Sequence, residues 1–311
     1  MSKKMDDVNQ HLPKKPTIAI VGINGTLGIH VINALTSAPF DDKISLPIHL
    51  ATKQKTNKPA SGQFKYFEVS PQDSAEALSK VFSGADIVID LTDSDADHIK
   101  ILNAAVLAKD PKVFIASEYG IDNDETSYHI FDKKRAVIKA AKEANMKTVS
   151  ICTGLFADYA IESPLAFGVS LETGTATIID NGDTPVSVSF VTDIGKVIAS
   201  VVTTPIGKLP AKLHVQSDVT TARQVIDIYE AASGKKLKVS RIGLGDARTQ
   251  AHEIDKMGVK STNDSYMILQ TIGAEGKGAN FSRNNHNQDV NPDLFEWTSF
   301  EQRAKMAWKN K

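Results

Sequence analysis

The fold is decided by a stretch near the N-terminus, TIAIVGINGTLG, at residues 17–28. Its first five residues, 17–21, are largely apolar and β-branched, which is typical of a strand buried on both faces. Three glycines follow at the spacing GxxGxxG, and apolar residues then recur at helical spacing over 27–35. The stretch therefore predicts a strand, a glycine loop and a helix in direct succession.

Strand and helix patterns alternate through the first half of the chain. We expect further strands at 47–52, 65–69, 85–91, 112–116 and 147–152, and further helices at 74–82, 97–108 and 131–145. Such alternation indicates a parallel sheet with helices on both faces. The predicted fold class is α/β, a Rossmann-type doubly wound parallel sheet with a smaller C-terminal α+β substrate lobe.

The alternation of strands and helices is less regular in the second half of the chain. We expect strand, turn and strand over 175–190, a helix at 193–202, a strand at 213–216, a helix at 221–232, a long loop at 273–291 and a solvated helical tail at 303–311. The predicted domains are a mobile tail at 1–15, an NADP-binding Rossmann domain at 16–157 with a return segment near 186–204, and a mainly substrate-binding lobe at 158–311.

Composition excludes several classes of protein. The 311 residues carry 36 Lys and Arg against 37 Asp and Glu, a formal net charge of -1, which argues against a nucleic-acid or membrane-surface binder. The single cysteine, Cys152, excludes an internal disulfide framework and a multi-cysteine zinc site. No segment reads as a membrane span. We expect a cytoplasmic protein with no metal, and leave a homodimer or a protein partner open.

The glycine loop predicts a dinucleotide site. Gly22 turns the chain off the strand, Gly25 lets the backbone approach a pyrophosphate, and Gly28 lets the helix pack closely on the sheet. The anion then binds free N–H groups at the helix N-terminus. The residues assigned to this role are Gly22, Asn24, Gly25, Thr26, Leu27 and Gly28. The alternative is a merely structural turn.

The end of the second strand favours NADP over NAD. An NAD site offers an acidic side chain to the ribose there, but this chain has Lys53 and Lys55, which favour a 2′-phosphate. Asp41 and Asp42 precede the strand and do not easily reach the ribose. The alternative is that both lysines are ordinary surface charges.

The run Asp93-Ser94-Asp95-Ala96-Asp97-His98 looks like a calcium loop. It has His98 where such a loop needs glycine and Ala104 where it needs a bidentate glutamate. We expect these acids to cap a helix instead.

None of the six tyrosines has a lysine four residues later, so the Tyr–Lys pair of ordinary short-chain dehydrogenases is absent. Three other segments resemble the NmrA-like, isoflavone-reductase-like family of atypical short-chain dehydrogenases/reductases. IASEYG at 115–120 resembles its LPSEFG segment, FDKK at 131–134 resembles the start of its lysine-bearing helix, and TGLFADY at 153–159 resembles its SNCFAGY segment. The sequence departs at Gly154 and Leu155, where Asn and Cys are usual.

The resemblance implies site residues. It gives Lys134 the role of general acid or base beside the nicotinamide. The helical periodicity does not show whether Lys134 or the adjacent Lys133 faces the site. The alternative is that both are ordinary surface lysines. The resemblance places Phe156 against the nicotinamide ring. Thr92 and Ser117 follow strands at the edge where ligands gather in open α/β sheets, and Glu118 lies there as a site residue or a structural acceptor.

Two functions follow from this resemblance. The first is an NADPH-dependent reductase that transfers a hydride to a small carbonyl, quinone or conjugated aromatic substrate. The second is a non-catalytic NADP(H)-sensing regulatory protein of the NmrA-like type. Lys134 favours the enzyme, whereas the departure at Gly154 and Leu155 slightly favours the sensor. Epimerase or dehydratase chemistry is a weaker alternative, because the Tyr–Lys pair is missing.

Overall fold

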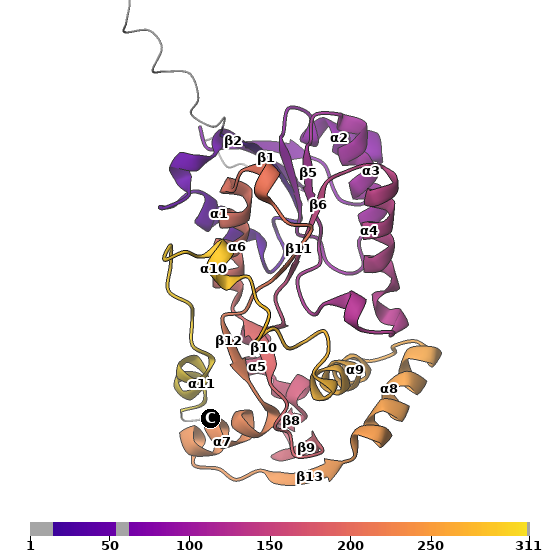
Figure 1. Cartoon of the computed structure of the whole chain (residues 1–311), viewed down its shortest axis with the longest axis vertical. Coiled ribbons are helices and arrows are strands. Elements are labelled where there is room, and N and C mark those ends of the chain that lie inside the picture. The colour runs from indigo at the N-terminus through magenta and orange to yellow at the C-terminus, as the bar shows by residue number, and fades with distance from the viewer. Residues whose placement is uncertain (1–14, 54–61, 310–311) are drawn as a thin grey trace, which may run out of the picture.

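The computed structural model describes residues 15–53 and 62–309 (Figure 1). The strands and helices predicted for the first half are present, with their ends shifted by no more than two residues. They are β1 (Thr17–Val21), α1 (Gly28–Leu35), β2 (Ser45–Thr52), β3 (Phe64–Glu68), α2 (Ala75–Phe82), β4 (Ile87–Asp90), α3 (His98–Ala108), β5 (Val113–Ile115), α4 (Asp132–Glu143) and β6 (Thr148–Cys152).

These strands form one parallel sheet together with β11 (Lys212–His214). The sheet has seven strands in the order β11-β6-β5-β4-β1-β2-β3. The chain proceeds from β1 toward β2 and β3 on one side and then returns to β4 on the other, so the strand order reverses between β1 and β4. In doubly wound sheets ligands bind outside the carboxyl ends of the strands at such a reversal. The predicted fold class is confirmed.

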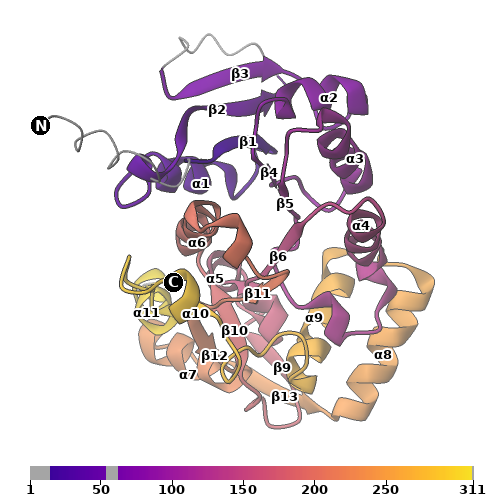
Figure 2. The same cartoon turned by 45° about the horizontal axis from the view of Figure 1, so that its top comes forward.

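Helices cover both faces of this sheet (Figure 2). Alternate side chains of β1 point to opposite faces, and both sets are apolar. Ile18 and Ile20 join a core beneath α1 and α6 (Val191–Thr203), whereas Ala19 and Val21 join a core beneath α2, α3 and α4. Among the described residues, no helix is both long and apolar enough to cross a membrane.

The rest of the chain builds a second lobe around its own core. Its elements are β7 (Leu155–Phe156), α5 (Ala157–Glu162), β8 (Val169–Ser170), β9 (Thr175–Ile179), β10 (Val186–Ser189), β12 (Asp218–Thr220), α7 (Ala222–Ser233), β13 (Lys238–Ile242), α8 (Leu244–Met257), α9 (Thr262–Glu275) and α11 (Phe300–Trp308). The short helix α10 (Asn287–Val290) lies against α6 instead, and its Val290 joins the core of the seven-stranded sheet. Two three-stranded sheets, β12-β10-β7 and β13-β9-β8, lie in this lobe.

The expected strand–turn–strand unit is not a hairpin, since β9 and β10 lie in different sheets. β9 pairs with β8 and β13, whereas β10 pairs with β7 and β12. The turn between them binds α7 instead, because the Arg223 N–H donates to the Gly182 carbonyl at 3.0 Å and its Nε to Asp183 at 3.2 Å. The turn therefore directs the chain from one sheet to the other.

Two other expectations for the second half are correct only in part, since 276–286 is the expected loop and 303–308 the expected helix, but each prediction missed packed structure. The predicted loop at 273–291 begins inside α9 and contains α10. The predicted solvated tail is α11, whose Phe300, Ala304 and Trp308 recur every four residues and are buried. The Trp308 Nε1 donates to the Ile161 carbonyl at 2.9 Å, which fastens α11 to α5. The exposed lysines between these buried positions led the sequence analysis to expect a fully solvated segment.

Candidate active site

The glycine loop connects β1 to α1 at the reversal of strand order. Gly22 has φ +87°, and a Cβ there would lie 2.6 Å from backbone atoms of Leu91 and Thr92. A Cβ on Gly28 would lie 1.9 Å from the Ile23 carbonyl oxygen, whereas one on Gly25 would come no closer than 3.3 Å to its neighbours. Two of the glycines are thus required by packing, and Gly25 is exposed where a ligand would approach.

No side chain of the described residues caps the N-terminus of α1. Its N-cap, Leu27, supplies no side-chain hydrogen bond, and the first turn holds no acidic residue. The first backbone N–H groups of a helix lack partners within the helix and carry its positive dipole end. This part of the fold fits a pyrophosphate.

A cavity of about 640 Å³ brings most of the predicted cofactor residues together. Its lining includes Gly22, Asn24, Gly25, Thr26, Leu27, Lys53, Thr92, Ser117, Lys134 and Phe156. Gly28 lies beneath the loop rather than in the lining, and Lys55 lies outside the described residues. Below, this space is the first cavity.

Sequence reasoning missed several residues of the first cavity, among them Pro71, Gln72, Ser94, His98, Tyr119 and Tyr159. Pro71 and Gln72 follow the carboxyl end of β3, so strand order would have been needed to find them. The Tyr159 hydroxyl lies 2.7 Å from the Thr26 hydroxyl, and its ring stacks on Phe156 with a centroid distance of 6.0 Å. This contact links the glycine loop to α5.

A buried aspartate–histidine pair lies beside the first cavity, whose lining includes His98. The Asp90 carboxylate at the end of β4 is 2.7 Å from Nδ1 of His98 and accepts from the Thr92 N–H at 2.9 Å. Burial lowers the pKa of His98, but the hydrogen bond and charge of Asp90 outweigh it, so the net shift is upward. Asp97, as expected of this run, caps α3 by accepting from the Lys100 N–H at 3.0 Å.

The structure separates the two adjacent lysines of α4. Lys133 is exposed, whereas Lys134 is partly buried and lines the first cavity. Burial lowers the pKa of Lys134, and the nearby Glu118 opposes that shift. Of the two, only Lys134 is placed to meet a ligand.

A second cavity, of about 460 Å³, adjoins the first. Both are lined by Ser94, Tyr119, Lys134, Phe156 and Tyr159. The remainder of the second cavity is mainly apolar, with Ile121, Phe131, Leu155, Ala160, Ala166, Tyr266 and Leu269 in its lining. Lys134 thus lies where the two spaces meet.

The lining of the second cavity includes a glycine with no room for a side chain and two polar atoms without partners in the described part of the chain. Gly154 lines it, and a Cβ there would lie 2.1 Å from the Ser187 carbonyl oxygen, so a larger residue at this position requires a different backbone path. The hydroxyl of Tyr119 and Oδ1 of Asn123 are buried without a hydrogen-bond partner among the described residues. Such groups are available to a bound molecule.

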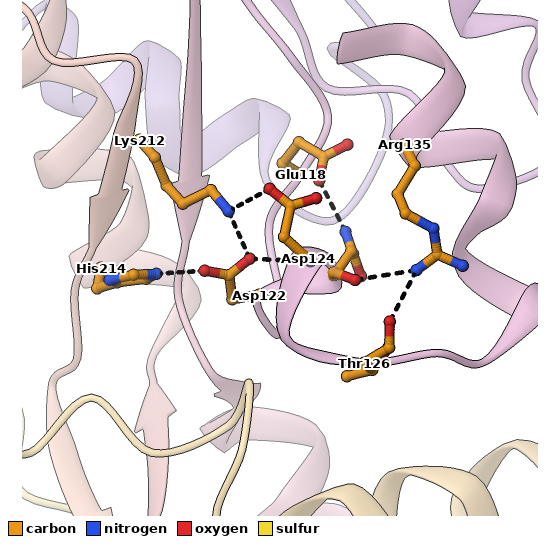
Figure 3. A network of polar contacts seen from close by, with 8 residues as sticks. Glu118, Asp122, Asp124, Thr126, Arg135, Lys212 and His214 are labelled. Carbon is orange, nitrogen blue, oxygen red and sulfur yellow. Dashed lines mark hydrogen bonds and ion pairs between the residues drawn. The ribbon is translucent and has the colours of Figure 1, made fainter. Parts of the chain in front are cut away.

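A polar network behind the second cavity holds the loop after β5 (Figure 3). Asp122 accepts from Nζ of Lys212 at 2.6 Å and from Nε2 of His214 at 2.7 Å. Cys152 lies within 4.8 Å of the Asp122 and His214 ligand atoms. However, Lys212 already neutralises this carboxylate, and burial raises the pKa of the thiol, so the group is arranged as a hydrogen-bond network.

We expect Asp122→Asn to destabilise the fold by about 2 kcal/mol at pH 7. Although burial raises the pKa of Asp122, its bonds to His214 and Lys212 bring it down to about 2. The stabilisation is therefore complete above the ordinary pKa of 3.8 and lost as pH falls toward 2. Urea unfolding at pH 7 and pH 3 measures this difference. Asp124→Asn, at a mostly exposed carboxylate on the same lysine, is the control, and equal losses in both variants would contradict the assignment.

Comparison with known proteins assigns the family. A model of the NmrA-like family matches residues 14–301. The chain therefore belongs to the NmrA-like family, and the resemblance inferred from the sequence is confirmed.

Solved structures confirm the fold. An isoflavone reductase crystal structure matches with a TM-score of 0.73 at 19% identity, over 94% of this chain and 99% of that one. A binary complex of leucoanthocyanidin reductase and NADPH from Vitis vinifera matches with a TM-score of 0.71 at 18% identity, over 94% and 99%. Among curated proteins, an asnovolin J 5',6'-dehydrogenase of Aspergillus novofumigatus is 26% identical over 235 residues, which are 70% of this chain and 69% of that protein.

Proposed function

We propose that the protein is an NADPH-dependent reductase of a small carbonyl, quinone or conjugated aromatic compound. The observation that carries this proposal is the place of Lys134, which lines both the dinucleotide-sized first cavity and the apolar second cavity. A proton donor belongs at such a junction, because the acceptor of a hydride must also receive a proton.

The first cavity fits NADP(H). The glycine loop and the uncapped N-terminus of α1 would hold the pyrophosphate, Lys53 would face the 2′-phosphate, and Phe156 would pack on the nicotinamide. The Vitis vinifera leucoanthocyanidin reductase, which shares the fold, binds NADPH, and this supports the same cofactor here.

The chain's own groups supply orientation and the proton. NADPH, when bound in the first cavity, would supply the hydride that the electrophilic carbon of the substrate accepts. The electron pair displaced from the substrate double bond then collects on its oxygen, and the Lys134 ammonium protonates that oxygen. A lysine whose pKa is lowered by burial gives up its proton more readily than a surface lysine. Solvent then returns a proton to Nζ.

The second cavity would take a largely apolar substrate. Its lining is mainly aliphatic and aromatic, and Phe131, Leu155 and Tyr266 provide flat or branched apolar surface for ring packing. Tyr119 and Asn123 leave buried polar atoms unpaired. A substrate with a ring system and an oxygen function satisfies both properties.

Consumption of NADPH with a panel of quinones and aryl aldehydes tests the proposal. We expect turnover with at least one compound, and its loss in Lys134→Ala. Tight NADP(H) binding without turnover of any compound would instead favour the sensor, for which the departure at Gly154 is the supporting observation. The location of the protein in the cytosol stays a prediction, and so does its association with a second copy or a protein partner.

Replacing Lys53 should weaken the preference for NADPH. Lys53 is exposed at the end of β2 and lines the first cavity, so its ammonium would contact the 2′-phosphate and not the rest of the dinucleotide. We expect Lys53→Ala to lower NADPH affinity roughly tenfold and to leave NADH affinity unchanged. Isothermal titration calorimetry with both dinucleotides measures this, with Lys65→Ala on neighbouring β3 as the control. An equal loss for both dinucleotides would exclude the phosphate contact.

A further inference from the structure

The ring of His98 uses only one of its two nitrogen atoms inside the protein. Nδ1 is 2.7 Å from the Asp90 carboxylate, and the residue is 6% exposed. Every hydrogen bond of this ring in the described part of the chain involves Nδ1. Nε2 is not one of the unpaired atoms that are fully enclosed, and His98 lines the first cavity. The free nitrogen therefore keeps its accessible surface toward the space that would hold the dinucleotide.

Asp90 decides what the free nitrogen can do. Its carboxylate already accepts from the Thr92 N–H at 2.9 Å and from the Thr92 hydroxyl at 2.5 Å. It accepts from Nδ1 of His98 as well, so Nδ1 carries a hydrogen in both charge states of the ring. Nε2 is then a bare acceptor in the neutral ring and an N–H donor in the protonated ring. Burial disfavours the protonated ring, but the hydrogen bond and charge of Asp90 favour it, and the net pKa of His98 is raised.

The pair lies beside the glycine loop. A Cβ on Gly22 would lie 2.6 Å from backbone atoms of Leu91 and Thr92, so the loop packs on the segment that runs from Asp90 to His98. Gly22, Thr92 and His98 all line the first cavity. Because the loop would hold the pyrophosphate, an N–H donor next to it is placed to meet oxygen atoms of the dinucleotide.

We propose that His98 is a cofactor-binding residue: anchored through Nδ1 to Asp90, its ring donates from Nε2 to an oxygen atom of the dinucleotide in the first cavity. The inference rests on the proposed function only for the identity of the ligand, since binding requires neither a substrate nor turnover. A merely structural pair would need Nδ1 alone.

Two substitutions separate the roles of the two ring nitrogens. The amide nitrogen of asparagine can take the place of Nδ1, and that of glutamine the place of Nε2. His98→Asn should therefore keep the bond to Asp90 and lower NADP⁺ affinity about tenfold, whereas His98→Gln should lose less affinity. Isothermal titration calorimetry on the full chain measures both, and urea unfolding checks that the variants fold. His129→Asn should change nothing, since His129 is an exposed histidine that also pairs with an aspartate, at 3.1 Å, but lines neither cavity.

The ring of wild-type His98 gives a second readout, which holds even if the asparagine variant does not fold. Burial and Lys134 of α4 lower the pKa of His98, whereas Asp90 and Glu118 after β5 raise it. Bound NADP⁺ should raise this pKa by about one further pH unit, which corresponds to a tenfold preference for the protonated ring. Long-range ¹H–¹⁵N NMR spectra measure this shift, and NADP⁺ should move the Nε2 resonance more than that of Nδ1.

Wild-type affinity in a folded His98→Asn protein, or an Nε2 resonance that saturating NADP⁺ does not move, would overturn the proposal. A larger loss of affinity in His98→Gln than in His98→Asn would also overturn it, because the bond to Asp90 would then be the one that matters. Absence of NADP⁺ binding by the wild type would reject this contact together with the proposed function. Binding that depends on His98, without turnover of any panel compound, would support the contact and reject the reductase.

Discussion

Replacing Lys134 with methionine should lower kcat/KM at least a hundredfold and leave NADPH binding intact. General acid catalysis by a placed side chain contributes about 10²- to 10⁴-fold. Methionine keeps an unbranched side chain only one heavy atom shorter at the junction of the two cavities but cannot donate a proton. Steady-state kinetics and calorimetry on the same preparation separate the two effects. Lys133→Met is the matched control, since Lys133 is exposed on the same helix.

The same variant should also be more stable than the wild type at neutral pH. Burial lowers the pKa of Lys134 in the folded protein, so the unfolded chain binds the proton more tightly. The wild type therefore gains stability as pH rises from the folded pKa to the ordinary value near 10.4, and Lys134→Met lacks this gain. Urea unfolding at pH 7 and pH 10 measures both quantities. A variant less stable than the wild type at pH 7 would show that Lys134 is not a buried charge held for function.

The largest structural effect is expected at Gly28. A Cβ there would lie 1.9 Å from the backbone oxygen of Ile23, which no side-chain movement relieves. We expect Gly28→Ala to destabilise the fold by about 3 kcal/mol or more. Gly25→Ala should keep the fold, because its Cβ would come no closer than 3.3 Å to its neighbours. It should nevertheless weaken NADPH binding about tenfold or more, because the methyl group projects where the pyrophosphate would lie.

Thermal unfolding and calorimetry of the two alanine variants check this contrast. Stability should fall in Gly28→Ala alone, whereas cofactor affinity should fall in Gly25→Ala without a loss of stability. If Gly25→Ala binds NADPH as tightly as the wild type, the loop is only a structural turn.

The first half of the fold was predictable because its signals are local. The apolar strand Thr17–Val21, the glycine loop and the alternation that follows are each contained in short windows. The separation of β9 and β10 into different sheets was not predictable in this way. The turn at Gly182 that divides them makes its decisive contacts with Arg223, about forty residues further on.

The same distinction between local and long-range signals applies to the site. The glycine loop and Lys134 follow from motifs, and the first cavity contains nearly all of the cofactor residues predicted from them. Contacts between distant segments carry no sequence signature. His214 meets Asp122 across 92 positions and Tyr159 meets Thr26 across 133, so neither pair was visible before the fold. The pairing of His98 with Asp90 was hidden differently, inside an acidic run that resembles a calcium loop.

A crystal structure of the full chain with NADP⁺ tests the central claim most directly. The account predicts the pyrophosphate on the loop at 22–28, the 2′-phosphate beside Lys53, and the nicotinamide between Phe156 and Lys134 with one face toward the second cavity. A dinucleotide bound away from Lys134, or with its nicotinamide turned from the second cavity, would contradict it.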